Sequence, residues 1–597
     1  MAEGTGLILV IGGYGGFGAR LCRRLSAAGY SLLVGGRNEA EAARFSSGLA
    51  GARPLLIDRG GDVGAVLARE RPDLVIDAAG PFQGSGYAVP RACIAAGIAY
   101  LDLADATAFV AGIDALDVEA REAGVPVISG ASSVPALTGA VARKLAEGLD
   151  RVGSVDIALS AANRATGGAS VVAAILSYVG RPVRVRRGGR WTSARGWQEM
   201  RREDFVLSDG TALRGRLVAV ADVPDCLLLP DLLPGRPAVS FRAGTELGFH
   251  MVALWLASWP VRWGWIRSIR GALRWLLPLY RLTQSLGGDR SAMRVSLTGS
   301  EAGRRVERHW TIVAERGEGL EVPTLAAELL AGEILSGRCP AGARSAAGLL
   351  SFERFEPALS RLAVRHETSE RDLPPPLYAR VLGAAFDALP RAVRRLHDIG
   401  RDAGAAGEGR VERGKGLLAR AVGAVMRFPP EGVWPLHVSF SERGGVETWT
   451  RDFGGHRFYS TLSARGGGIV ERFGPVRFVF GIPVGAEGLE MRLRGWSVFR
   501  IPLPRFLGPR ISAREWEDEE GRFRFEVRAA LPLVGGIVRY AGWLVGIEEA
   551  LDEKGGPLSD RPLRQMPAKP LSASRTGSCG GPWRGRTSCA RRRAGRG

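Results

Sequence analysis

A glycine-rich turn near the N-terminus constrains the fold of this chain more than any other feature. It has the spacing G-x-G-x-x-G, and it lies between the apolar run Leu7–Ile11 and the start of a helical pattern. In such a strand–turn–helix unit the first glycine permits the tight turn, the second lets backbone approach a pyrophosphate, and the third lets the helix pack on the strand. The helix N-terminus then offers free N–H groups to phosphate. The motif predicts a dinucleotide site at Gly13, Gly15, Gly16, Phe17 and Gly18.

Short apolar runs alternate with helical patterns throughout residues 1–148. The runs that we expect to form strands are 7–11, 31–34, 54–57, 74–77, 99–101 and 125–128. Continuous apolar strands separated by helices are typical of a parallel sheet that is covered on both faces. The fold class expected for 1–148 is therefore α/β, a Rossmann-type doubly wound parallel sheet.

The remainder of the chain divides by composition into four parts. Residues 149–366 mix strand and helix patterns, which predicts an α+β domain for substrate binding or dimerisation, and the polar, proline-bearing segment 367–377 is interpreted as a linker. Residues 378–548 begin with helices and then alternate apolar and polar positions, which predicts a separate β-rich α+β domain. Gly, Arg, Pro and Ser dominate 549–597, so we expect a disordered basic tail.

The ends of the second and fourth predicted strands bear on the choice of cofactor. An NAD site usually has an acidic residue after the second strand, whereas this chain has Arg37 and Asn38 there. Arg37 can pair with a 2′-phosphate, which favours NADP over NAD; the alternative is a solvated arginine at a helix start. The small residues Ala79 and Gly80, followed by Pro81, would let the nicotinamide half of the cofactor lie against the backbone.

Two family resemblances follow from these residues and from the later sequence. The glycine turn, Gly35-Gly-Arg37, Gly80-Pro-Phe82 and Tyr100-Leu-Asp102 resemble the saccharopine dehydrogenase-like NAD(P)-binding family. This resemblance implies a Rossmann domain and NAD(P)-linked oxidoreduction, in a broader family that includes enoyl reductases acting on lipid intermediates. The pattern from Leu389 to Leu544, including Trp449-Thr-Arg451-Asp-Phe453, is similar to the bacterial domain of unknown function 4166, which implies no established activity.

Candidate catalytic residues are few, because residues 1–143 contain neither histidine nor lysine. A general acid within the cofactor domain must then be Tyr, Asp, Cys or water. We select Tyr87, Asp102 and Asp105, since they lie at or near strand ends, where a nicotinamide ring would be. The competing interpretation is structural: Asp102 caps the next helix, and Tyr87 is an ordinary core residue. No histidine or cysteine spacing is typical of a metal site, so none is expected.

Charge and cysteine content set further limits. The net charge is +20, but it is spread thinly and only four of the 81 basic residues are lysine, so nucleic-acid binding is not expected. Six cysteines without disulfide or metal spacing fit a reducing compartment, and the first residues lack the basic segment of a signal peptide. These features favour a cytoplasmic protein.

Residues 249–282 are rich in tryptophan and arginine. Trp255, Trp259 and Trp263 recur at helical spacing, which fits a peripheral membrane contact, a cover over an apolar substrate, a homodimer contact or the core of the second domain. Taken together, the sequence favours an NADP-dependent oxidoreductase that acts on a small, apolar or lipid-like molecule. The alternative is a non-catalytic NADP-binding or scaffolding protein. For the C-terminal domain, an apolar ligand site beside Trp449 and Arg451 and a fully packed core are both open.

Overall fold

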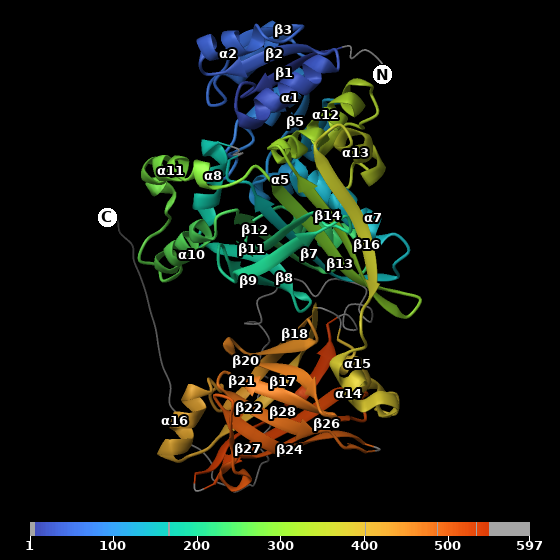
Figure 1. Cartoon of the computed structure of the whole chain (residues 1–597). Coiled ribbons are helices and arrows are strands. Elements are labelled where there is room, and N and C mark those ends of the chain that lie inside the picture. The colour runs from blue at the N-terminus through green and yellow to red at the C-terminus, as the bar shows by residue number, and fades with distance from the viewer. Residues whose placement is uncertain (1–5, 165–167, 400–401, 486, 533, 548–597) are drawn as a thin grey trace, which may run out of the picture. The chain divides into compact units, whose positions relative to one another are not determined.

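The computed structural model describes residues 6–164, 168–399, 402–485, 487–532 and 534–547 (Figure 1). The basic tail expected over 549–597 lies outside the described residues. Among the described residues, no helix combines the length and apolar character that crossing a membrane requires.

The first sheet is parallel and has the strand order β15-β6-β5-β4-β1-β2-β3. This arrangement confirms the predicted Rossmann-type fold, because the strand order reverses between β1 and β4 as in doubly wound sheets. Its strands are β1 (Leu7–Ile11), β2 (Ser31–Gly36), β3 (Ala52–Leu56), β4 (Leu74–Asp77), β5 (Ala99–Asp102), β6 (Pro126–Ser129) and β15 (Gly342–Ser345).

Helices cover both faces of this sheet, because alternate side chains of each strand point to opposite sides. Ile8 and Val10 pack with α1 and α12, whereas Leu9 and Ile11 pack with α3 and α4. The helices are α1 (Gly16–Ala27), α2 (Glu39–Ser46), α3 (Val63–Glu70), α4 (Ala88–Ala96), α5 (Thr107–Ala111), α6 (Asp117–Glu122), α7 (Thr138–Ala146), α12 (Val322–Leu335) and α13 (Phe352–Leu359).

The second sheet is mixed and has the strand order β10-β11-β12-β7-β13-β14-β16. Its strands are β7 (Arg151–Ala161), β10 (Arg201–Val206), β11 (Ala212–Val220), β12 (Ala238–Thr245), β13 (Ser291–Glu301), β14 (Arg304–Ala314) and β16 (Val364–Asp372); β8 (Pro182–Arg187) and β9 (Arg190–Arg195) form a separate pair. The helices of this region are α8 (Ala169–Tyr178), α9 (Asp225–Leu232), α10 (Gly248–Arg262) and α11 (Leu273–Leu282).

Two segments differ from the boundaries that the sequence suggests. β15 pairs with β6, so the region 149–366 contributes to two sheets rather than to a single domain. β16 pairs along its whole length with β14, so most of the expected linker 367–377 is an edge strand. β16 is polar because it is an exposed edge strand. The sequence of this segment alone does not distinguish such a strand from a polar linker.

The C-terminal domain is a closed antiparallel barrel of ten strands, drawn in orange and red in Figure 1. Each strand pairs with the next, and the pairs β17–β28 and β22–β24 complete the circle. The barrel strands are β17 (Asp402–Arg413), β18 (Gly432–Arg443), β19 (Val446–Phe453), β20 (His456–Arg465), β21 (Gly468–Phe473), β22 (Val476–Gly481), β24 (Gly488–Val498), β26 (Arg510–Glu517), β27 (Phe523–Leu531) and β28 (Gly535–Gly546). Two short strands, β23 (Val484–Gly485) and β25 (Ile501–Leu503), pair with β24, and three helices accompany the barrel: α14 (Leu377–Leu382), α15 (Arg391–His397) and α16 (Leu417–Val425).

Candidate cofactor site

The glycine turn joins β1 to α1 through close backbone contacts, which leave no room for a side chain at Gly18. Gly12 has a φ of +76°, and its carbonyl oxygen accepts a hydrogen bond from the Gly15 N–H at 2.9 Å. A Cβ added at Gly18 would lie 2.1 Å from that carbonyl oxygen. At Gly15, in contrast, an added Cβ would meet only the Gly12 oxygen, at 3.1 Å, and the residue is exposed. Gly18 is therefore required for packing, while Gly15 leaves backbone open to a ligand.

The end of β2 is shaped by a tyrosine from the glycine turn. The Tyr14 ring lies so close to Gly36 that a Cβ added there would be 2.2 Å from it, and the Tyr14 hydroxyl accepts a hydrogen bond from the Asn38 N–H at 2.9 Å. Asn38 also accepts a hydrogen bond from the Glu41 N–H and so caps α2. Arg37, between these two fixed residues, is exposed. Tyr14 thus fixes the backbone that carries Arg37.

A buried ion pair lies at the end of β4. Asp77 is fully buried, and its Oδ2 lies 2.8 Å from Nε of Arg59, a residue of the loop between β3 and α3. Burial raises the pKa of Asp77, and the charge of Arg59 opposes this rise. A buried carboxylate needs such a partner, because an unpaired buried charge is strongly destabilising.

Arg59 also holds the loop that follows β4. Its Nη1 donates hydrogen bonds of 3.3 Å to the Ala79 carbonyl and to the Ser85 hydroxyl, and its guanidinium lies 4.4 Å from the centre of the Phe82 ring. This loop contains Gly80 and Pro81, the residues expected beneath the nicotinamide. Arg59 is therefore a positioning residue that the sequence analysis missed, and no motif marks it.

Asp102 joins the ends of β5 and β6. Its Oδ1 accepts hydrogen bonds from the Ala104 N–H (2.9 Å), the Gly130 N–H (2.8 Å) and the Ser129 hydroxyl (3.0 Å). The side chain is fully buried, and this burial raises the pKa of its carboxyl to about 7. These contacts fix the carboxyl edge of the sheet.

The other two predicted catalytic residues differ in their freedom to react. The Tyr87 hydroxyl donates a hydrogen bond to the Phe109 carbonyl at 2.8 Å, and its ring packs on that of Phe109. Asp105 is exposed, and its Oδ1 accepts a hydrogen bond from Gln83 at 3.1 Å. Because Gln83 belongs to the loop after Pro81, Asp105 is on the side of the sheet edge where that loop lies.

Helix α8, from the second sheet region, runs along this edge. A Cβ added at Gly80 would lie 3.8 Å from the side chain of Ser170, in the first turn of α8. At the other end of α8, burial raises the pKa of the Tyr178 hydroxyl, and the nearby charges of Asp105 and Asp222 add to the rise. The Thr107 hydroxyl donates a hydrogen bond to Asp222 at 2.7 Å. Asp222 thus contacts the start of α5, which follows β5, and Tyr178 lies near Asp105 and Asp222, although no local signal in the sequence distinguishes these residues.

These residues fit a nicotinamide dinucleotide. The first-turn amides of α1 have no intrahelical acceptor, no acidic residue lies in that turn, and the Gly15 backbone is open to a phosphate group. The guanidinium of Arg37 has no ion-pair partner in the part of the chain that the structure describes. Among the described residues, no group of three or more His, Cys, Asp or Glu side chains is arranged so that it could hold a metal ion.

Comparisons with known proteins agree with this geometry. Residues 8–128 match the family described as the saccharopine dehydrogenase NADP binding domain. Residues 389–544 match the family described as a domain of unknown function, DUF4166. No curated protein sequence matches the chain.

Solved structures align with a small part of the chain. A 3-ketoacyl-(acyl-carrier-protein) reductase from Brucella melitensis, complexed with NADH, is 17% identical over 22% of this chain and 75% of its own, with a TM-score of 0.17. An oxidoreductase of the short chain dehydrogenase/reductase family from Burkholderia thailandensis is 20% identical over 21% of this chain and 68% of its own, with a TM-score of 0.18. The two family matches show that the chain joins a saccharopine dehydrogenase-type NADP-binding domain, over residues 8–128, to a C-terminal DUF4166 domain, over residues 389–544.

Proposed function

We propose that this protein is an NADP-dependent oxidoreductase that acts on a small, uncharged and largely apolar molecule. The observation that supports this most is the open glycine turn with the exposed Arg37 beyond it. The amides of Gly15, Gly16, Phe17 and Gly18 would hold the pyrophosphate, and Arg37, beside Asn38, would hold the 2′-phosphate. Ala79, Gly80 and Pro81 would lie against the nicotinamide half. When bound, the cofactor supplies a hydride.

Asp105 is the residue we assign to proton transfer. Of the two aspartates and one tyrosine selected from the sequence, Asp105 is the one that is an exposed residue, and desolvation of its carboxyl raises its pKa. Asp102 accepts three internal hydrogen bonds, and the Tyr87 hydroxyl donates to a backbone carbonyl. Gln83 donates a hydrogen bond to the Asp105 carboxyl, and Tyr178 is near enough for the charge of Asp105 to raise the pKa of its hydroxyl. The substrate would lie between the loop after β4 and α8.

A cytoplasmic location goes with this proposal. Cys22, Cys93, Cys226 and Cys339 are free thiols, and three of them are buried. Free thiols persist where the environment is reducing.

The test of this function is NADPH oxidation, followed by absorbance, with a panel of uncharged medium-chain enals, enones and ketones. We expect turnover with at least one of them, and we expect Asp105→Asn to lower kcat by about 100-fold, as loss of a general acid does, without weakening NADPH binding. Asp114→Asn removes an exposed acid of the same domain and serves as the control, with activity close to that of the wild type.

Tight NADPH binding without oxidation across the panel would contradict the enzymatic proposal. It would favour the alternative of a non-catalytic NADP-binding or scaffolding protein. Equal kcat in the wild type and Asp105→Asn would leave an oxidoreductase but remove Asp105 from its mechanism.

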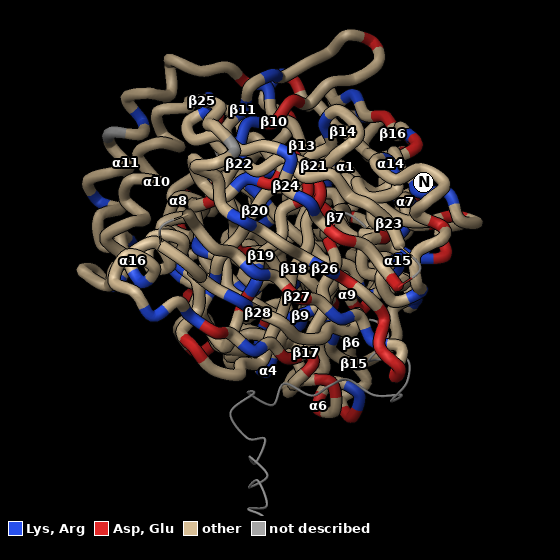
Figure 2. The backbone as a smooth tube through the Cα atoms, turned by 90° about the horizontal axis from the view of Figure 1, so that it is seen from below, with Lys and Arg blue, Asp and Glu red and all other residues tan. Residues whose placement is uncertain are grey.

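A second candidate function is association with an anionic membrane surface through α10, α11 and the loop between them. Trp263, Trp265 and Trp275 are 55%, 73% and 71% exposed, respectively. Residues 247–288 contain five arginines and no acidic residue, and Figure 2 shows only basic positions along α10 and α11. Exposed tryptophans beside arginines are typical of helices that lie in a membrane interface, where each basic residue contributes about 1 kcal/mol near an anionic surface.

Flotation with vesicles tests this association. We expect the full chain to float with vesicles of phosphatidylglycerol and phosphatidylcholine, much less with phosphatidylcholine alone, and less in high salt. The combined substitutions Trp263→Ala, Trp265→Ala and Trp275→Ala should reduce flotation by about tenfold or more, because each removes a large apolar group from the interface. Leu56→Ala with Val118→Ala removes exposed apolar side chains elsewhere and should have no effect.

The same variants separate a membrane contact from a homodimer contact. If the tryptophan substitutions convert a dimer to a monomer in size-exclusion chromatography, and neither form floats, the membrane proposal is wrong.

A further inference from the structure

The C-terminal barrel contains a cavity of about 250 Å³. A closed barrel of ten strands is wider than the eight-stranded size that side chains can just fill, so an internal space is expected. This volume is slightly below the range of about 300–1,000 Å³ that is usual for ligand pockets. From the sequence, both a fully packed core and an enclosed apolar site are open for this domain. The cavity shows that the core is not fully packed.

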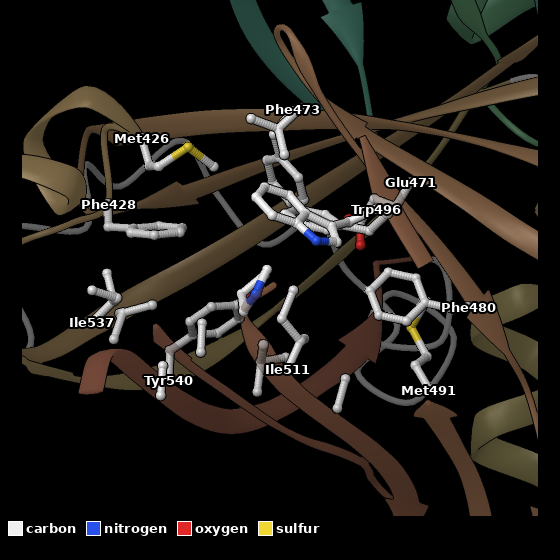
Figure 3. Close-up of a pocket in the computed structure, with 18 of the residues that line it drawn as sticks. Met426, Phe428, Glu471, Phe473, Phe480, Met491, Trp496, Ile511, Ile537 and Tyr540 are labelled. Carbon is white, nitrogen blue, oxygen red and sulfur yellow. The ribbon is translucent and has the colours of Figure 1, made fainter. Parts of the chain in front are cut away.

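Most of the cavity wall is apolar. Figure 3 shows aromatic rings, aliphatic side chains and methionines pointing into it from both sides. The apolar lining residues that are drawn and labelled are Met426, Phe428, Phe473, Phe480, Met491, Trp496, Ile511 and Ile537. Such a wall binds an apolar molecule by removing its surface from water.

The polar groups gather at one end of the cavity. In Figure 3 Glu471 lies near Phe480 and Met491, away from Met426 and Phe428 at the other end. Arg451 lines the same cavity, and its guanidinium lies 5.3 Å from the centre of the Trp449 ring. Glu515 also lines it.

Each charge at the polar end already has a partner within the protein. Arg451 Nη2 lies 3.6 Å from Glu471 Oε1, and Arg451 Nη1 donates a hydrogen bond to the Ser460 hydroxyl at 2.9 Å. Glu515 Oε2 lies 2.5 Å from Nε2 of the fully buried His397. A charged ligand of either sign would therefore be buried without a counterion of its own, at a considerable cost.

Exposed apolar side chains lie on two of the segments that contribute to the cavity wall or border it. Val422 and Met426, at the C-terminal end of α16, line the cavity, and so do Trp496 and Pro509, which border the segment 497–508. On their outer sides both segments expose large apolar residues: Leu417, Leu418, Val425, Phe499, Ile501, Phe506 and Leu507. An apolar molecule that enters here meets an apolar surface before it reaches the cavity.

We propose that the barrel is a binding site for an uncharged, largely apolar molecule that carries one hydroxyl or carbonyl group. The apolar part lies among Phe428, Ile511 and Ile537, and the polar group exchanges hydrogen bonds with Glu471, Glu515 or Arg451. The molecule enters between α16 and the segment 497–508. This site is independent of the cofactor site, and it does not rest on the oxidoreductase function.

The test uses the full chain and the uncharged fluorescent probe N-phenylnaphthylamine. We expect its emission to rise on binding and to be reversed by decanol. Decanoate and decylamine have the same chain length but carry a charge, and we expect each to displace the probe at least about tenfold less well than decanol, because a buried charge without a partner is costly.

A pair of substitutions in β26 locates the binding. Ala513 is buried in the cavity wall, and its neighbour Ser512 is exposed on the other face of the strand. Ala513→Phe should lower probe affinity by about tenfold or more by filling the cavity, whereas Ser512→Phe should not, since side chains alternate across a strand. NADPH affinity should be unchanged in both. If Ala513→Phe fails to fold by circular dichroism, Val422→Trp in α16 replaces it.

Three outcomes overturn the proposal. The first is a wild-type chain that does not bind the probe. The second is unchanged binding in a folded Ala513→Phe or Val422→Trp variant, which would place the probe on the exposed tryptophans of α10 and α11 instead. The third is displacement by decanoate or decylamine as effective as by decanol, which would contradict an uncharged ligand.

Discussion

Replacing Gly18 with alanine is expected to destabilise the first domain and to abolish NADPH binding. The added Cβ would lie 2.1 Å from the Gly12 carbonyl oxygen and 3.0 Å from the Gly13 Cα, so the backbone of the turn and the start of α1 must move apart. Overpacking against rigid backbone costs about 3 kcal/mol or more. Urea unfolding measures the loss of stability, and a fluorescence titration measures NADPH affinity.

Gly15→Ala is the matched substitution in the same turn. Gly15 has a φ of −73°, which alanine adopts readily, and its added Cβ would meet only one atom, at 3.1 Å. We therefore expect stability close to that of the wild type. NADPH affinity should still fall by about tenfold or more, because this backbone must approach the pyrophosphate closely.

The contrast between the two variants is the informative result. A stable Gly18→Ala protein would show that the helix does not pack on the turn as the structure has it. If Gly15→Ala binds NADPH as tightly as the wild type, the glycine turn does not contact the cofactor, even though the domain has a Rossmann fold.

Replacing Arg37 with aspartate is expected to reverse the preference for NADPH over NADH. Arg37 is exposed between Gly36 and Asn38, whose backbone is fixed by Tyr14. A hydrogen bond between charged groups contributes about 1.5–3 kcal/mol, so NADPH affinity should fall by roughly tenfold to a hundredfold. The new carboxylate would repel the 2′-phosphate and accept a hydrogen bond from the 2′-hydroxyl of NADH, which should bind more tightly.

Arg44→Asp controls for the change in net charge, because Arg44 is an exposed arginine of the neighbouring helix α2. It should leave the ratio of the two affinities unchanged. Equal affinity of the wild type for NADPH and NADH would contradict the assignment of NADP. If Arg44→Asp and Arg37→Asp change the ratio of the two affinities equally, the preference for NADPH comes from long-range electrostatics and not from a contact with Arg37.

The elements of the first domain are predictable from the sequence because their signals are local. The runs 7–11 and 74–77 coincide with β1 and β4, since a strand buried on both faces is apolar at nearly every position; Asp77, at the end of β4, is the exception and pairs with Arg59. The glycine turn is equally local, because steric conflict between Gly12 and Gly18 arises within seven residues of chain.

The contacts that complete the site are not local. Arg59 comes from the loop after β3 and Asp77 from the end of β4, and only the parallel pairing of β4, β1, β2 and β3 brings these strand ends to the same edge of the sheet. Tyr178 is near enough for the charge of Asp105 to raise its pKa, although more than 70 residues of sequence separate the two. Tyr87 stands out in the sequence by its position after β4, but the partner of its hydroxyl, the Phe109 carbonyl, is a tertiary contact.

The sequence by itself determined the Rossmann fold, the glycine turn, the position of Arg37 and the two family resemblances, because strand periodicity and turn stereochemistry act over a few residues. Only the tertiary structure decided that β15 returns to the first sheet, that residues 364–372 form an edge strand and that the C-terminal strands close into a barrel. These pairings join strands that are far apart in the sequence, so the local pattern of each strand does not determine its partner. The cavity follows from the same closure, since its volume depends on how many strands complete the circle.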